Sequence, residues 1–122
     1  MNQVILDTNF ILTCIKQKID FFKEIELMGS KILIPKQVIQ EIKRISDSKK
    51  KFKYREEAKL ALRLLEKSKF KKVDLKSKNT DNGLSKYSKE NDVIVATLDK
   101  ELKRKIKTPK LIIRGKKKLE II

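Results

Sequence analysis

The sequence predicts an α/β fold in which helices cover both faces of a mostly parallel sheet. Short apolar runs rich in β-branched residues recur along the 122-residue chain, as expected of strands buried on both faces. Segments with the apolar spacing of a helix alternate with these runs. Only three glycines and two prolines interrupt the chain, which favours long elements joined by short loops.

The first third of the chain contains two strands and one apolar helical stripe. Residues 4–6 read as a short buried strand. From residue 10 to about residue 28 the apolar positions follow a helical stripe, with a candidate break near Asp20. Residues 31–35, "KILIP", form a second buried strand, and the final proline suits the first turn of a helix.

The rest of the chain continues the alternation of helices and strands. The helix after Pro35 carries Val38, Ile42 and Ile45 on one face. A basic loop over 47–53 leads to a strong helix over 54–69. The elements expected after it are a weak strand at 71–75, a turn-rich connection at 76–83, a short helix to Glu90, a buried strand at 92–99, a short helix at 100–107 and terminal strands at 110–115 and 119–122.

Length and composition predict a single domain over residues 1–122 that acts in the cytoplasm. The lone Cys14 excludes an intramolecular disulfide and fits a reducing compartment. The apolar segment 4–15 is interrupted by three polar residues and is too short to span a bilayer. We therefore expect neither a signal segment nor a membrane partner.

A formal net charge of +16 favours a partner with a phosphate backbone. Residues 43–55 hold seven Lys or Arg against one acid, and residues 100–118 hold ten against one. Such runs also occur as solvated faces or at anionic membranes. No basic segment here has a broad apolar face suited to a bilayer, which favours nucleic acid.

Four acids follow four expected strands. They are Asp7, Glu41, Asp81 and Asp99. Because parallel strands end at one edge of a sheet, all four are expected to reach the same edge. Taken singly, Asp7, Asp81 and Asp99 could each cap a helix, and Glu41 could be a solvated helix residue. Their corresponding positions in four successive units favour a shared site.

Four carboxylates in one site repel one another unless a cation neutralises them. Ligands that offer only oxygen suit Mg²⁺ or Mn²⁺. Zinc is disfavoured because the chain has no histidine and one cysteine. The same lack of histidine excludes a Ser-His-Asp triad, and the isolated glycines exclude a phosphate-binding loop. The "LDTN" stretch has Asn9 where haloacid dehalogenase-like phosphatases carry a second aspartate.

The arrangement of these motifs resembles a PIN-domain ribonuclease over nearly the whole chain. The matching stretches are "VILDTNFIL", "IPKQVIQEI", "TDNGLSKYSKENDVIVATLDKELKRKI" and "LIIRGKKKLEI". The pairing of "DNGL" with "ATLDKEL" is the most specific of them, whereas residues 47–72 carry no family signature.

The resemblance implies a three-layer α/β/α sandwich with four or five mostly parallel strands. It also implies a divalent-metal-dependent endoribonuclease that leaves a 5′ phosphate and a 3′ hydroxyl. Asp7, Glu41, Asp81 and Asp99 would be the catalytic and metal-binding acids, with Mg²⁺ or Mn²⁺ as the cofactor. Asn9 and Thr97 would support them, and Asn82 stands where many relatives have another acid. The RNA-binding residues would come from the basic runs and include Lys49, Lys50, Lys51, Lys53, Lys103 and Arg104.

Three roles within this resemblance are open at the level of sequence. The "ATLDKELKRKIK" segment is similar to PIN nucleases that process ribosomal RNA, which is the favoured reading. VapC-type toxins, which pair with an antitoxin, share the fold and the acids. A PIN-like protein that binds RNA without cutting it is the third, although the intact acidic set argues against it. The partners implied are RNA, with a second copy of the chain, an antitoxin or a pre-ribosomal partner as further candidates.

Overall fold

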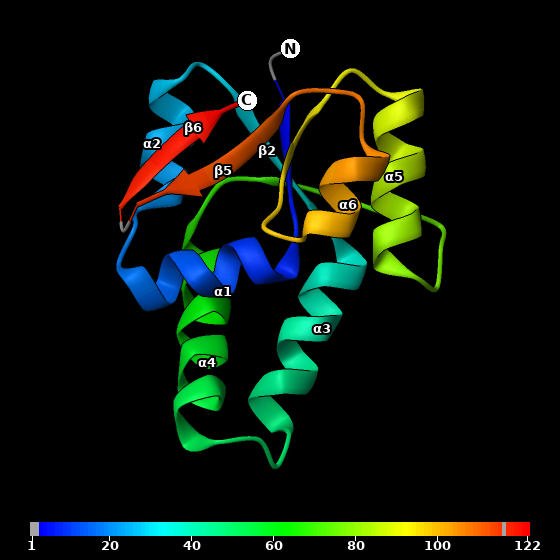
Figure 1. Cartoon of the computed structure of the whole chain (residues 1–122). Helices are drawn as coiled ribbons and strands as arrows, with labels where there is room; N and C mark the ends of the chain where they lie inside the picture. The colour runs from blue at the N-terminus through cyan, green and yellow to red at the C-terminus, as the bar shows by residue number, and fades with distance from the viewer. Residues whose placement is uncertain (1–2, 116) are drawn as a thin grey trace.

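The computed structural model describes residues 3–115 and 117–122 and has the predicted α/β fold (Figure 1). Lys116 of the basic run 100–118 lies outside the described residues. Within them the chain forms six helices and six strands. In order these are β1 (Gln3–Leu6), α1 (Thr8–Gln17), α2 (Phe21–Leu27), β2 (Lys31–Pro35), α3 (Lys36–Asp47), α4 (Phe52–Lys67), β3 (Lys71–Val73), α5 (Thr80–Glu90), β4 (Ile94–Ala96), α6 (Lys100–Lys105), β5 (Lys110–Arg114) and β6 (Lys118–Ile121).

The strands form one sheet in the order β3-β2-β1-β4-β5-β6. All neighbouring strands are parallel except β5 and β6. Val4 of β1 aligns with Ile32 of β2 on one side and with Ile94 of β4 on the other. After β1 the chain adds β2 and then β3 on one side of β1, and it later adds β4, β5 and β6 on the other side. The switch in strand order therefore lies between β1 and β4. The carboxyl ends of these strands are where a ligand site is expected.

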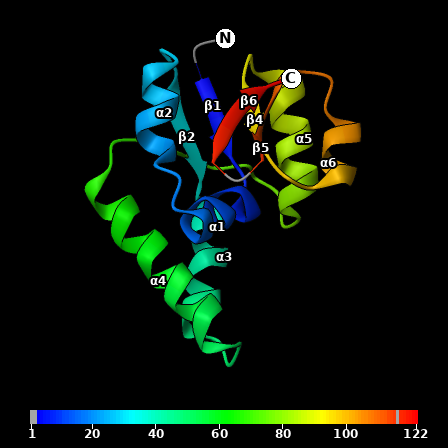
Figure 2. The same ribbon diagram turned by 60° about the vertical axis from the view of Figure 1, so that its left-hand side comes forward.

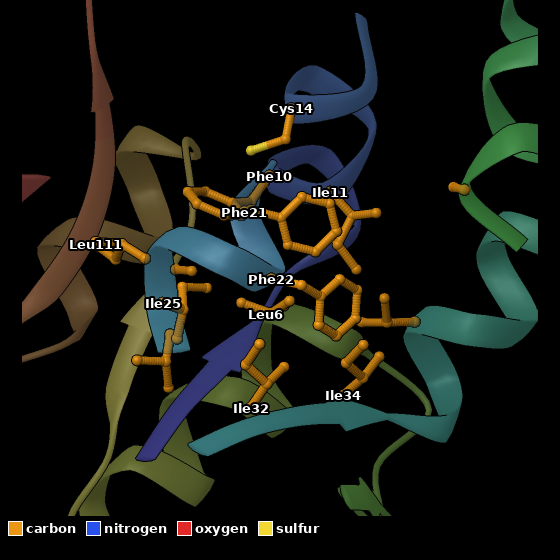
Figure 3. Packing of buried hydrophobic residues seen from close by; sticks show 14 of the residues in the cluster. Leu6, Phe10, Ile11, Cys14, Phe21, Phe22, Ile25, Ile32, Ile34 and Leu111 are labelled. Carbon is orange, nitrogen blue, oxygen red and sulfur yellow. The ribbon is translucent and has the colours of Figure 1, made fainter. Parts of the chain in front are cut away.

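The apolar strands are buried on both faces because their side chains alternate between two cores. Val4 and Leu6 of β1 belong to one hydrophobic cluster, and Ile5 between them belongs to the other. Figure 3 shows the first cluster, in which the rings of Phe21 and Phe22 pack near Leu6. The ring of Phe21 meets the ring of Phe10 edge-on, with 6.5 Å between centroids.

Helices cover both faces, which gives the predicted three layers (Figure 2). Helices α1 to α4 each contribute to the first cluster, through Phe10, Phe21, Val38 and Ala58 among others. Helices α5 and α6 cover the second face with Leu84 and Leu102, and Ile106 directly after α6 joins them. Helices α3 and α4 pack against each other and project beyond the end of the sheet (Figures 1 and 2).

The sheet has six strands where four or five were expected. The sixth, β6, pairs antiparallel with β5, with Arg114 opposite Lys118. Gly115 begins the turn with φ +66°, a conformation that glycine adopts without strain. Residues 119–122 were expected to be extended, but only the backbone pairing across this turn adds them to the sheet.

The apolar stripe over residues 10–28 is two helices, as the candidate break near Asp20 predicted. Lys18 ends α1 in the left-handed conformation, and its N–H bonds to the carbonyls of Cys14 and Ile15. Asp20 then caps α2 by accepting a hydrogen bond from the N–H of Lys23 at 3.2 Å. Two caps within three positions explain why the stripe changes direction here.

No helix within the described residues combines the length and the apolar character needed to cross a bilayer.

Candidate active site

Asp7 stands where β1 ends and α1 begins, and both its oxygens accept hydrogen bonds. Its Oδ1 accepts from the backbone N–H of Thr8 at 2.8 Å, and its Oδ2 accepts from the hydroxyl of Thr97 at 2.9 Å. Burial raises the pKa of Asp7 to about 6, against the lowering effect of these two hydrogen bonds. Asp7 is therefore the cap of α1, and it is also a buried carboxylate that is costly to ionise.

Thr97 connects Asp7 to the start of α6. Its side chain is fully buried, donates to Asp7 and accepts a hydrogen bond from the N–H of Asp99 at 3.1 Å. Asp99 caps α6 by accepting from the N–H of Glu101 at 2.9 Å and of Leu102 at 3.2 Å. Thr97, a predicted supporting residue, thus links the ends of β1 and β4, which are neighbours in the sheet.

Glu41 is held by two hydroxyls that the sequence reading did not single out. The hydroxyl of Thr8 donates to Oε2 of Glu41 at 2.9 Å, and the hydroxyl of Thr80 donates to Oε1. Each threonine is adjacent in sequence to a predicted acid, Thr8 to Asp7 and Thr80 to Asp81. That adjacency is the only signal in the sequence that could have marked them.

The fourth acid, Asp81, lies in the first turn of α5. Burial and the neighbouring Asp99 carboxylate raise the pKa of Asp81, while the ammonium of Lys105 acts in the opposite direction and Glu41 adds a smaller upward effect. Asp81 and Glu41 also contribute to the raised pKa of Asp7. The structure therefore brings all four predicted acids into one electrostatic environment at the carboxyl end of the sheet. Figure 1 shows α1, α3 and α6 beginning at that end.

The donor chemistry of this site fits a hard divalent cation. Within the described residues, no three Asp, Glu, Cys or His side chains are grouped closely enough to hold a metal ion as placed. The donors present are carboxylates that repel one another, and each carboxylate oxygen can accept more than one bond. Asp7 and Glu41 therefore keep lone pairs beside their threonine hydrogen bonds, and oxygen ligands match Mg²⁺ or Mn²⁺.

Asn9, the other predicted supporting residue, lies in the first turn of α1 with an exposed side chain. Within the part of the chain that the structure describes, Asn9 makes no hydrogen bond to any of the four acids. Thr97 and Asn9 thus differ: the hydroxyl of Thr97 contacts an acid directly, and the amide of Asn9 faces solvent.

A groove of about 670 Å³ lies beside the acids, between α3 and the segment that leads into α5. Its wall includes Glu41 and Asp81 together with the cations Lys36, Arg44 and Lys78. A smaller hollow of about 270 Å³ also contains Glu41 and Arg44 and reaches Lys50. The two hollows share a wall, so the basic loop is connected to the acids along α3.

The six predicted RNA-binding residues fall into two groups, and Lys50 alone among them lines one of these two hollows. Lys49, Lys50 and Lys51 occupy the loop between α3 and α4, and Lys53 lies in the first turn of α4, all exposed. On α6, Lys103 is half-buried and Arg104 is exposed. Phe52, in the same region, is 68% exposed, and the guanidinium of Arg55 lies 5.8 Å from its ring centre.

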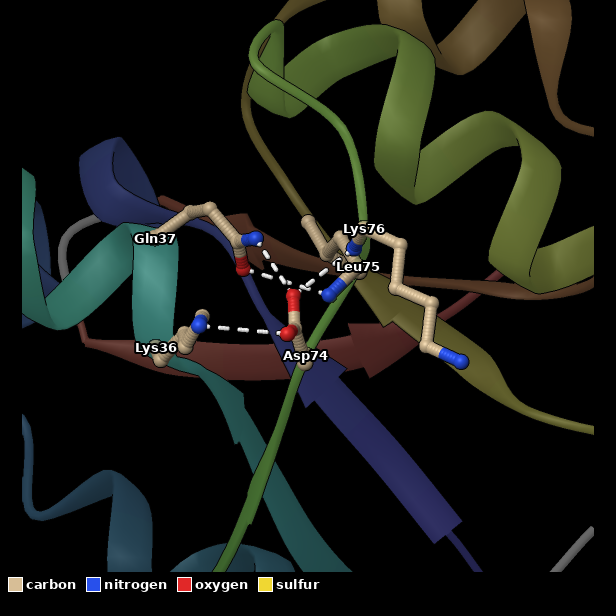
Figure 4. Close-up of polar contacts among 5 residues, drawn as sticks. All are labelled: Lys36, Gln37, Asp74, Leu75 and Lys76. Atoms are coloured by element: carbon tan, nitrogen blue, oxygen red, sulfur yellow. Dashed lines mark hydrogen bonds and ion pairs between the residues drawn. The ribbon is translucent and has the colours of Figure 1, made fainter.

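A polar network fixes one wall of the groove (Figure 4). Asp74 accepts hydrogen bonds at 2.8 Å from the amide of Gln37 and from the N–H of Lys76, and it pairs with Lys36 at 3.1 Å. These contacts, with the Lys76 N–H the strongest, lower the pKa of Asp74 to about 2. Gln37 also accepts from the N–H of Leu75 at 3.2 Å. The start of α3 is thereby tied to the chain that leads to Thr80 and Asp81.

Comparison with known proteins matches the PIN-like domain family over residues 4–116. A curated relative, Ribonuclease VapC4 of Methanocaldococcus jannaschii, is 37% identical over 99% of this chain and 97% of its own length. The solved structure of the PIN domain endonuclease Utp24 has a TM-score of 0.78 at 27% identity, covering 98% of this chain and 90% of that one. VapBC2 from Rickettsia felis, solved bound to a DNA fragment from its promoter, has a TM-score of 0.62 at 18% identity, covering 88% of this chain and 98% of that one. This last likeness concerns the fold alone.

Proposed function

Because the chain belongs to the PIN-like domain family, as its motifs predicted, we propose that it is a divalent-metal-dependent endoribonuclease. One observation carries this proposal: Asp7, Glu41, Asp81 and Asp99 come from four separate elements and share one end of the sheet. The relative with 37% identity is named a ribonuclease, which supports RNA as the substrate.

The chain's own residues divide the work as follows. Asp7, Glu41, Asp81 and Asp99 would hold Mg²⁺ or Mn²⁺, and Thr8, Thr80 and Thr97 orient three of these carboxylates through hydrogen bonds or the backbone. When bound, such a cation supplies the charge that lowers the pKa of the attacking water and stabilises the departing oxygen. Arg44 and Lys78, beside Glu41 and Asp81, neutralise the phosphates of the RNA next to the bond that is cut.

Such a ribonuclease could process ribosomal RNA or act as a toxin that an antitoxin silences. Ribosomal RNA processing was favoured from the sequence, with a VapC-type toxin as the alternative. The identity to a protein named VapC4, over nearly the full length of both chains, supports the toxin role and with it an antitoxin as partner. Induced expression with mapping of the cleaved RNAs separates the two roles. A toxin arrests growth and is silenced by a cognate antitoxin, whereas a processing enzyme matures a ribosomal precursor without arrest.

The activity itself is tested with purified protein on a labelled RNA, in chelator and in Mn²⁺. We expect cleavage only with the cation and products with a 5′ phosphate. Asp99→Asn should lose at least roughly a hundredfold in rate while still binding RNA. Asp47→Asn, which makes the same charge change at an exposed position at the end of α3, is the matched control and should cut normally. Equal residual cleavage by Asp99→Asn and the parent would disprove the assignment of the site.

A further inference from the structure

A further basic hollow lies on α5 and α6, next to the turn that carries Asp81. It has a volume of about 490 Å³ and is lined by Asn82, Ser85, Lys86, Lys89 and Lys105. Lys86 and Lys89 are three positions apart on α5 and so lie on one face of that helix, and Lys105 ends α6. All three lysines are exposed, and every residue of the lining carries a polar side chain.

The first turn of α5 separates this hollow from the groove along α3. Asp81 lines the α3 groove, and the next residue, Asn82, lines the lysine hollow. The ammonium of Lys105 is close enough to act on the carboxylate of Asp81. Asp81 therefore lies between two hollows that both contain cations, one with Arg44 and one with the three lysines.

We propose that the hollow formed by Lys86, Lys89 and Lys105 binds phosphates of the RNA strand that continues past the acids on the side away from α3. This inference rests on the proposed function. The substrate of an endonuclease extends in both directions from the bond that is cut, and the groove along α3 accommodates one direction. The lysine hollow offers the strand in the second direction three ammonium groups and a lining without an apolar residue, which matches a sugar–phosphate backbone.

A second hollow of nearly the same volume, far from the acids, provides a control for the lysine hollow. A hollow of about 500 Å³ at the opposite end of the sheet carries Lys31, Lys69 and Lys71, all of them exposed. Lys31 begins β2 and Lys71 begins β3, so this hollow is at the amino ends of the strands, far from the acids. Replacing three lysines with alanine in either hollow removes the same charge.

The test compares the two triple variants by fluorescence anisotropy with a labelled single-stranded RNA, in chelator so that nothing is cut. We expect the Lys86→Ala, Lys89→Ala, Lys105→Ala protein to bind roughly tenfold to a hundredfold more weakly and to lose about 2 from the log–log salt slope, at about 0.7 per lost phosphate contact. The Lys31→Ala, Lys69→Ala, Lys71→Ala protein should keep most of the parent affinity. Equal losses in both would mean that bulk charge alone attracts RNA, and the proposal would fail, as it would if neither lost affinity.

A length series locates the subsite. With RNAs from about 4 to about 16 nucleotides, the affinity of the parent should keep rising to a greater length than that of the Lys86, Lys89 and Lys105 variant. Identical length dependence would place the lysines off the path of the strand. Polyaspartate is the second probe, and a loss of polyaspartate binding equal to the loss of RNA binding would assign the hollow to acidic polypeptides instead.

These readouts are independent of catalysis. A chain that binds RNA through the lysine hollow but never cleaves it would disprove the proposed function and leave the subsite intact. A chain that cleaves RNA, with equal affinity in both triple variants, would support the proposed function and disprove the subsite.

Discussion

The hydroxyl of Thr97 donates a 2.9 Å hydrogen bond to Oδ2 of Asp7, although 90 positions separate the two residues in sequence. The bond exists because β1 and β4 are neighbours in the sheet, with Leu6 aligned to Ala96. Asp7 directly follows Leu6, and Thr97 directly follows Ala96. The two side chains therefore meet at the carboxyl end of the strands. The same hydroxyl accepts the N–H of Asp99, and one side chain thus orients two of the predicted acids.

Thr97→Val should therefore destabilise the protein without changing its shape. The variant leaves the buried Oδ2 of Asp7 without a donor and the N–H of Asp99 without an acceptor. We expect a loss of about 1–3 kcal/mol in the free energy of unfolding, measured by urea denaturation in chelator. Thr13→Val, on a half-buried part of α1, is the matched control and should change it little. Equal effects of the two substitutions would mean that the hydroxyl of Thr97 has no special role.

The raised pKa of Asp7 predicts a specific dependence of stability on pH. A carboxyl whose pKa is higher in the folded state binds more protons when folded than when unfolded. The stability that Asp7 contributes is therefore fully present below its ordinary pKa of 3.8 and is lost as pH rises through its folded pKa of about 6. A shift of this size corresponds to at most about 3 kcal/mol.

Asp7→Asn isolates this effect, because the amide does not titrate. Between about pH 4 and about pH 7.5 in chelator, the free energy of unfolding of the variant should rise relative to that of the parent by up to about 3 kcal/mol. The difference between the two proteins cancels the titration of every group that does not interact with Asp7. A constant difference across this range would show that the carboxylate of Asp7 ionises normally.

Divalent cations should reverse the penalty that the acids impose. Mn²⁺ at a hundredfold excess over its dissociation constant should stabilise the parent by about 2.7 kcal/mol through mass action. Asp7→Asn, with one carboxylate fewer, should gain much less. Thermal melts of both proteins in chelator and in Mn²⁺ provide the comparison. Identical shifts would remove Asp7 from the cation site and leave it as the cap of α1.

Gly83 should resist substitution even though it lies inside a helix. A Cβ added there would approach the Cβ of Leu75 to 3.0 Å and that of Ser77 to 3.1 Å. Alanine normally favours a helix by about 1 kcal/mol over glycine, but here it would push α5 away from the chain that follows β3. We expect Gly83→Ala to lower the melting temperature and the rate of RNA cleavage together, because Thr80 and Asp81 move with α5. A higher melting temperature would show that Leu75 yields without cost.

Much of this structure was predictable because it depends on neighbours in sequence. Strand burial, the break near Asp20 and the position of Asp7 at the end of a strand are local patterns of apolar and capping residues. The fold class and the placement of the acids at one end followed from the alternation of strands and helices. The number of strands in the sheet did not follow from this alternation, because β6 joins the sheet only by pairing with β5 across the turn at Gly115.

By itself the sequence determined which apolar segments are buried, the order of the helices and strands and which acids follow the strands. The tertiary structure alone decided which hydroxyl meets which carboxylate and which lysines share a hollow. Thr8 and Thr80 reach Glu41 across 33 and 39 positions. Lys86, Lys89 and Lys105 come from two helices, and of the three only Lys105 lies in a basic run that was expected to bind RNA. The physical reason is that sequence periodicity shows on which face of its own helix or strand a side chain lies. These contacts depend instead on the strand order, which sets which elements become neighbours.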